Sequence, residues 1–156
     1  MPKNEFNCLA TAVGSMPHTD AKSACAQVTR YLKDIPAWPQ LPRRAYVEDM
    51  NVQYSEGFPG VVVDTERRKI RVDRNQDLTQ PMEQLYTAFL AGDADRYAVS
   101  RDYAAGLHEF LSLTNLTPKL VKGQVTGPVT WGLNVVDGEG KGIIYDDFLG
   151  DAVPKF

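Results

Sequence analysis

The segment Lys122–Leu133, KGQVTGPVTWGL, requires an extended segment to end and a helix to begin with no ordinary turn sequence between them. Gly127 gives the corner conformational freedom, and Pro128 presets the φ angle of a first helical turn. Thr126 can cap the exposed N–H groups of that turn. The segment therefore predicts a strand that runs directly into a helix.

Gln124 and Thr126 are candidate site residues at this corner. They lie two residues apart, so their side chains project to the same side of a strand. In a barrel of parallel strands that side is the interior or the mouth, where binding and catalytic groups lie. Gly127, at the turn itself, completes this candidate group.

Short apolar runs alternate with helical stripes along the rest of the chain. Pro36, Pro39 and Pro42 exclude a helix or a long strand in the segment that contains them. In the first half, we expect a strand at 8–13, a helix from 19 or 20, a short strand around 38–41 and a helix over 45–54. A hairpin of 61–63 with 70–72 follows, and then helices over 78–91 and 94–113. The chain continues with a strand at 120–125, a helix from 128 and a last helix from 144.

This alternation predicts an α/β fold with parallel core strands. The chain has 156 residues, which fits a single domain over 1–156. A complete (β/α)8 barrel needs about 250 residues, and only about three core strands are expected here. The chain is therefore too short for a full barrel.

Composition excludes several classes of partner. The net charge is −3, so there is no basic excess of the kind that nucleic-acid binding needs. No apolar run reaches the ~18 residues of a membrane span, and no signal-peptide pattern follows Met1. Two cysteines do not make a disulfide framework. We therefore expect a cytoplasmic protein with reduced thiols and with neither a nucleic-acid nor a membrane partner.

The loop Thr11–Asp20, TAVGSMPHTD, joins the first strand to the first helix. Gly14 permits a close backbone approach, and Ser15 with the N–H groups at the helix start could hold a carboxylate. The alternative is a tight turn with a helix cap. His18 could be a general base, a ligand contact, a metal ligand or a polar surface group.

No metal site is predicted within this chain. His18, His108, Cys8 and Cys25 lie in four different segments, and none has a partner at ligand spacing. Gly138–Gly142 is glycine-rich but lacks the Gly-Lys-Ser/Thr ending of a phosphate loop, so we expect an ordinary loop there.

The motifs at the two strand ends resemble those of one enzyme family. KGQVTGPVTWGL resembles the Lys-Gly-x-x-Thr-Gly-Pro-Val-Thr segment of cobalamin-independent methionine synthases. TAVGSMPH resembles that family's x-x-Gly-Ser-x-Pro segment, at the end of its first catalytic strand. YVEDMNVQY is similar to the stretch that follows its second strand. The three motifs occur in the family's order and span most of the chain.

The resemblance implies an α/β fold that is the N-terminal part of a (β/α)8 TIM-type barrel, with an inserted β-hairpin. It implies methyl transfer to a thiol such as homocysteine, with zinc and a folate or corrinoid methyl donor in a complete protein. The family's metal ligands lie in later strands, so no cofactor is assigned to this chain. The substrate-binding residues implied are Val13, Gly14, Ser15, Glu48, Gln124, Thr126 and Gly127, with Glu48 on the substrate amine. His18, where the family commonly has a different polar residue, is a further substrate-binding candidate from its place in the first loop.

Two alternatives remain beside this one. A barrel related to uroporphyrinogen decarboxylase would need arginines near the strand ends, where Arg43 and Arg44 are the candidates. A non-catalytic domain would associate through an open sheet edge. In either barrel, we expect the chain to form a homodimer or to require a missing C-terminal half.

Overall fold

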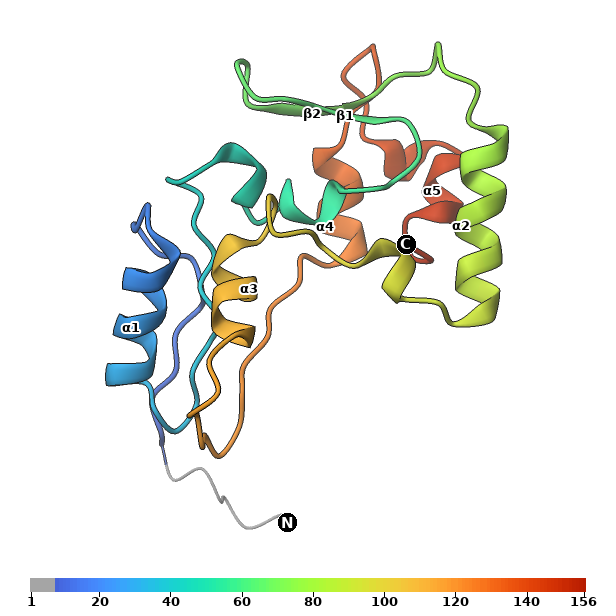
Figure 1. Cartoon of the computed structure of the whole chain (residues 1–156). Helices are drawn as coiled ribbons and strands as arrows, with labels where there is room; N and C mark the ends of the chain where they lie inside the picture. The colour runs from blue at the N-terminus through green and yellow to red at the C-terminus, as the bar shows by residue number, and fades with distance from the viewer. Residues whose placement is uncertain (1–7) are drawn as a thin grey trace.

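The computed structural model describes residues 8–156 and has a mixed α/β arrangement (Figure 1). Within that range its helices and strands are α1 (Ala21–Tyr31), β1 (Val61–Asp64), β2 (Lys69–Val72), α2 (Thr79–Ala91), α3 (Ala105–Leu111), α4 (Pro128–Asn134) and α5 (Leu149–Ala152). None of the helices described is long and apolar enough to cross a membrane.

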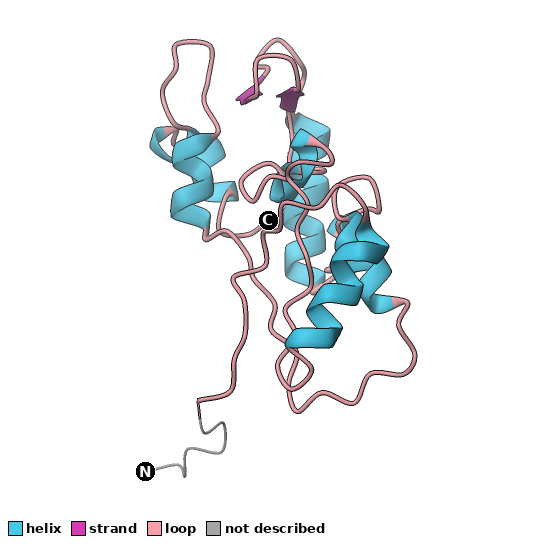
Figure 2. Cartoon of the chain, turned by 90° about the vertical axis from the view of Figure 1, so that its left-hand side faces the viewer, coloured by secondary structure: helices cyan, strands magenta, loops and turns pink. Residues whose placement is uncertain are grey.

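Three extended segments run parallel to one another beside α1 and α3. We call residues 11–16, 34–40 and 119–124 the first, second and third segments. The second lies in the middle, because it forms parallel bridges to both of the others. The segments are drawn as loop in Figure 2, because each pairing is a single bridge and not a ladder.

Backbone hydrogen bonds fix the alignment of these segments. The Met16 N–H donates to the Gln40 carbonyl at 2.9 Å, and the Gln40 N–H donates to the Gly14 carbonyl at 2.9 Å. On the other side, the Lys122 N–H donates to the Pro36 carbonyl at 2.9 Å. The parallel direction expected from the sequence is therefore present between these extended segments.

The regular core strands expected at 8–13 and 120–125 are absent. Pro36 and Pro39 lie in the central segment and have no N–H to donate, so a continuous ladder cannot form on either side of it. No closed barrel is present among residues 8–156. The described part of the chain is thus α/β, with a parallel arrangement that stops short of a sheet.

Helices α1 and α3 pack together against the extended segments (Figure 1). α1 begins after Asp20, whose carboxylate accepts a 2.8 Å hydrogen bond from the Ser23 N–H, as expected for an N-cap. Cys25 is buried in this small core, beside Trp38 and Phe110. Burial raises the pKa of the Cys25 thiol to about 11, so this thiol stays protonated.

The predicted hairpin is confirmed as the antiparallel pair β1–β2, with Val61 opposite Val72. Strand β2 pairs with the loop that follows α4. The Val72 N–H donates to the Val136 carbonyl at 2.9 Å, and the Val136 N–H donates to the Ile70 carbonyl at 3.2 Å. The hairpin therefore covers this loop and not an edge of the extended segments.

The larger core lies between the hairpin, α2, α4 and α5. Met82 and Leu85 of α2 belong to the same buried cluster as Trp131 of α4 and Leu149 of α5. The helix predicted here is confirmed, and its predicted apolar stripe is confirmed in part, because Met82 and Leu85 are buried but Phe89 and Leu90 are exposed. The helix expected from Pro128 is also confirmed, with Gly127 as its N-cap.

Three helix predictions were wrong in length. The helix expected over 45–54 is two 3-10 turns, Tyr46–Glu48 and Gln53–Ser55. Between them the Asp49 carboxylate accepts a 3.1 Å bond from the Asn51 N–H, a local bond that competes with a continuous helix.

The helix expected over 94–113 is shortened to a 3-10 turn, Asp95–Tyr97, and α3. The Ser100 N–H donates to the Glu56 carboxylate at 2.7 Å, which holds the intervening segment outside a helix. The helix expected from 144 is likewise interrupted. Asp146 accepts a 2.7 Å bond from the Leu149 N–H and so caps a new helix, α5.

Candidate functional site

Polar groups gather where the three extended segments end on the same side. We define the carboxyl-edge cluster as the residues at these ends that contact one another: Val13, Gly14, Ser15, Gln40, Lys122 and Gln124. The structure thus brings together four of the predicted site residues, Val13, Gly14, Ser15 and Gln124.

Gly14 and Gln124 are in direct contact across the cluster. Gly14 has φ +131°, and a Cβ built on it would lie 1.7 Å from the Gln124 Nε2 atom. The side-chain amide of Gln124 therefore lies against the glycine backbone, where only glycine leaves room for it. This Nε2 atom is buried and has no hydrogen-bond acceptor within residues 8–156.

Lys122 ties the first and third segments together. Its ammonium group donates to the Val13 carbonyl at 2.8 Å and to the Gln124 Oε1 atom at 3.4 Å. Its side chain is half-buried. The cluster therefore contains a positively charged ammonium group whose two hydrogen bonds go to neutral oxygen atoms.

A chain of hydrogen bonds through buried side-chain amides connects the cluster to the interior of the fold. The Ser15 hydroxyl donates to Gln40 Oε1 at 3.4 Å, the Gln40 Nε2 donates to Gln53 Oε1 at 2.6 Å, and the Gln53 Nε2 donates to the Tyr103 carbonyl at 2.7 Å. Gln40 and Gln53 are almost fully buried. Because buried amides are costly to leave unpaired, this chain fixes how the ends of the first and second segments meet.

Thr126 and Tyr54 lie next to the cluster. The Thr126 hydroxyl donates to the Met50 carbonyl at 2.6 Å, and the Tyr54 hydroxyl donates to the Gln124 carbonyl. Burial raises the pKa of Tyr54 to about 12, so its hydroxyl remains a neutral donor. Gly127 is exposed, and no atom lies within 4 Å of where its Cβ would be.

A mainly apolar cavity of about 220 Å³ adjoins Thr126 and Tyr54. Trp131, Tyr97 and Phe156 form much of its wall. Their rings pack against one another or against Phe58 in tilted and edge-to-face pairs, at centroid distances of 4.8 to 6.1 Å. Trp131 is 3% exposed and donates from its indole to Ser55, so it is a core residue with one side on the cavity.

Glu48 is fully buried and pairs with Arg44. Burial raises the pKa of its carboxyl group, and the Arg44 guanidinium partly opposes that effect. Neither partner is hydrogen-bonded to the carboxyl-edge cluster, and Glu48 Oε2 has no hydrogen-bond partner in the described range. The structure therefore places Glu48 inside the fold and not at an open edge.

His18 is partly buried, and its Nδ1 atom has no hydrogen-bond partner among the residues described. No hydrogen bond joins it to the cluster. The other histidine, His108, contacts the Val99 carbonyl through Nε2 at 2.9 Å.

Lys122, Gln40 and Gln53 were not predicted as site residues. The spacing that places Gln124 beside Thr126 also places Lys122 on the same side of the segment, so this lysine could have been found. Gln40 and Gln53 meet only through the tertiary fold, and no spacing in the sequence indicates their contact.

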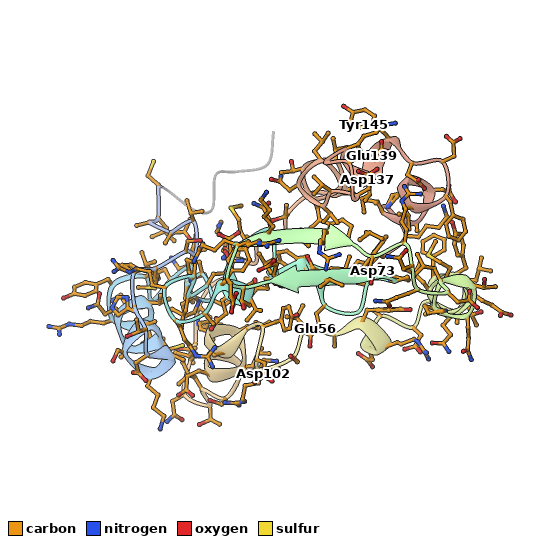
Figure 3. The ribbon with its side chains drawn as sticks, turned by 90° about the horizontal axis from the view of Figure 1, so that it is seen from above. Glu56, Asp73, Asp102, Asp137, Glu139 and Tyr145 are labelled. Atoms are coloured by element: carbon orange, nitrogen blue, oxygen red, sulfur yellow. The ribbon has the colours of Figure 1, made fainter. Side chains whose placement is uncertain are left out.

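A second charged group lies beside the hairpin, where Asp73, Asp137 and Glu139, labelled in Figure 3, line a surface pocket with Arg74. Arg74 forms ion pairs with Asp137, at 3.9 Å, and with Asp146. The Asp137 carboxylate also accepts bonds from the Glu139 and Lys141 N–H groups at 3.0 and 2.9 Å, which organise the glycine-rich loop. Within residues 8–156 no group of three or more His, Cys, Asp or Glu side chains could hold a metal ion.

No protein family model, curated protein or solved structure matches this chain. The chemistry of the carboxyl-edge cluster therefore carries the functional argument. It combines an ammonium group, a hydroxyl, side-chain amides and a glycine backbone, a set suited to binding a small polar molecule.

Proposed function

We propose that the carboxyl-edge cluster is the substrate-binding part of a methyltransferase of the methionine-synthase type, and that it binds the amino-acid portion of a thiol such as homocysteine. On this proposal, the three extended segments are the first strands of a (β/α)8-type barrel. The zinc ligands and the methyl donor site would belong to the strands that follow.

One observation carries the proposal. The two segments that resemble the methionine synthases, 11–18 and 122–133, are far apart in the sequence. Gly14 of the first contacts Gln124 of the second at the ends of parallel segments. Binding groups of α/β barrels lie at this end of the strands. The contact supports a shared site better than it supports two unrelated turns.

Calorimetric titration of the chain with L-homocysteine tests the proposal. We expect saturable binding. Gln124→Ala should weaken it by about tenfold, because the variant loses a hydrogen bond to the charged ligand or to the backbone that holds the ligand. Gln80→Ala, an exposed change on α2, is the matched control and should leave binding unchanged. Absence of binding, or equal effects of the two variants, would count against the proposed site.

A further inference from the structure

We propose that Lys122 is the specificity-determining residue of the carboxyl-edge cluster, and that its ammonium group binds the carboxylate of the ligand. The amino-acid identity of that ligand rests on the function proposed above. The anion preference rests on the surroundings of Lys122 alone.

The charge of Lys122 is not balanced within the described part of the chain. No Asp or Glu oxygen among residues 8–156 lies within 4.0 Å of its Nζ atom, whereas Lys119, three residues earlier on the same segment, pairs with Asp34 at 3.9 Å. A half-buried charge has lost part of its hydration and is stabilised by an opposite charge nearby. The site therefore favours an anionic ligand.

The hydrogen-bond capacity of Lys122 is also incompletely used. An ammonium group has three donors, and two of them are directed to the Val13 carbonyl and the Gln124 side chain. The remaining donor is available to a ligand. A carboxylate, which only accepts hydrogen bonds, matches both this donor and the charge.

The neighbours of Lys122 fit the same ligand. The Ser15 hydroxyl is exposed and makes only a long 3.4 Å bond to Gln40, so it can turn toward a ligand. The two existing bonds of Lys122 hold its Nζ atom between the ends of the first and third segments. Lys122 is thus positioned before the ligand arrives, which lowers the entropy lost on binding.

Titration by NMR with three probes tests the inference on the 156-residue chain. The probes are L-homocysteine, its decarboxylated analogue, and norvaline, which keeps the carboxylate and replaces the thiol with a methyl group. Lys122→Gln removes the charge and keeps a donor, and Lys119→Gln is the matched control. Circular dichroism melting of both variants checks that they fold.

We expect Lys122→Gln to weaken homocysteine and norvaline by about tenfold, which corresponds to about 1.4 kcal/mol, and to leave the decarboxylated analogue unchanged. Lys119→Gln should change none of the three. Equal weakening of all probes, no effect of Lys122→Gln, or no binding by either carboxylate would overturn the inference. If norvaline binds as tightly as homocysteine and depends on Lys122, the anion site stands and the thiol function fails.

Discussion

Gly14 is the residue on which the geometry of the carboxyl-edge cluster depends most. Its φ of +131° is open to glycine and unfavourable for other residues, and the Gln124 amide occupies the position of a Cβ. Two independent constraints, backbone and space, therefore require glycine here. A side chain at position 14 would violate both constraints and shift the backbone of the neighbouring Ser15.

Gly14→Ala should lower the free energy of unfolding by roughly 2 kcal/mol, because it adds backbone strain and displaces Gln124. Urea denaturation followed by circular dichroism measures this change. Gly138→Ala is the control, since it lies in a loop with no atom within 4 Å of its Cβ position. A Gly14→Ala protein as stable as Gly138→Ala would show that the Gly14–Gln124 contact is absent.

Glu48 makes the stability of the protein depend on pH. Burial raises the pKa of its carboxyl group above the usual glutamate value of 4.5, so the folded protein holds this proton more tightly than the unfolded chain. Its contribution to stability is then fully present below that value. It is lost as the pH rises through the folded-state pKa.

The substitution Glu48→Gln should remove this dependence. The free energy of unfolding of the wild type, minus that of Glu48→Gln, should fall as the pH is raised from 4 through the range above 4.5. Taking the difference cancels the surface carboxylates, several of which have lowered pKa values and act in the opposite direction. A difference that is flat or rises with pH would mean that the folded state does not raise this pKa.

At the scale of elements, helix α3 lies directly against the central extended segment. A Cβ on Gly106 would lie 2.0 Å from the Pro39 carbonyl oxygen, and that atom belongs to the backbone. The missing side chain lets the helix approach the segment whose prolines prevent a full ladder. The packing of α3 thus helps to hold the central segment in place, as hydrogen bonds between strands do in a regular sheet.

Gly106→Ala should therefore destabilise the protein by about 3 kcal/mol, although alanine is the better helix former. Thermal unfolding compares it with Gly123→Ala, where the new Cβ would meet Trp38 at an ordinary 3.7 Å. Stabilisation by Gly106→Ala, the result that helix propensity alone predicts, would contradict the packing described.

The elements that the sequence predicts well are those decided by local patterns. The hairpin follows from its β-branched runs, α2 from its apolar stripe, and α4 from Gly127-Pro128. The errors occur where side chains replace backbone partners, as at Asp49 and Asp146, or where proline removes donors from a strand, as at Pro36 and Pro39.

The residues of the candidate site also include some that local sequence patterns predict and some that they do not. Gly14 and Gln124 could be predicted because each lies at the end of an apolar run beside a turn or helix start. The Gln40–Gln53 bond could not, because it depends on how two loops meet in space. Placing Glu48 at the substrate amine is a prediction from resemblance, and its burial beside Arg44 is visible only in the fold.

At the scale of the whole molecule, the third segment leaves apolar surface uncovered. It pairs with the second segment on one side, and its other side has no strand partner within residues 8–156. Val121 on this segment, and Val125 and Val129 just after it, are 53%, 73% and 62% exposed. Exposed apolar side chains next to an open edge favour association.

We expect the chain to self-associate, most simply as a two-fold dimer. Light scattering over a concentration series should show a mass that rises toward twice 17.3 kDa. Val129→Glu should shift this equilibrium toward the monomer, whereas Leu90→Glu, at an 83% exposed position on α2, should not. A monodisperse monomer at high concentration, with a sharp unfolding transition, would show that the chain covers its own edges.

The candidate site depends on the alignment of the three extended segments and on the contact between Gly14 and Gln124. Nuclear Overhauser spectroscopy of the labelled chain tests this arrangement. We expect cross-peaks between the Gly14 Hα protons and the Gln124 side-chain amide, together with contacts from Met16 to Gln40 and from Pro36 to Lys122. Spectra of the folded protein that lack the Gly14–Gln124 cross-peak would contradict it.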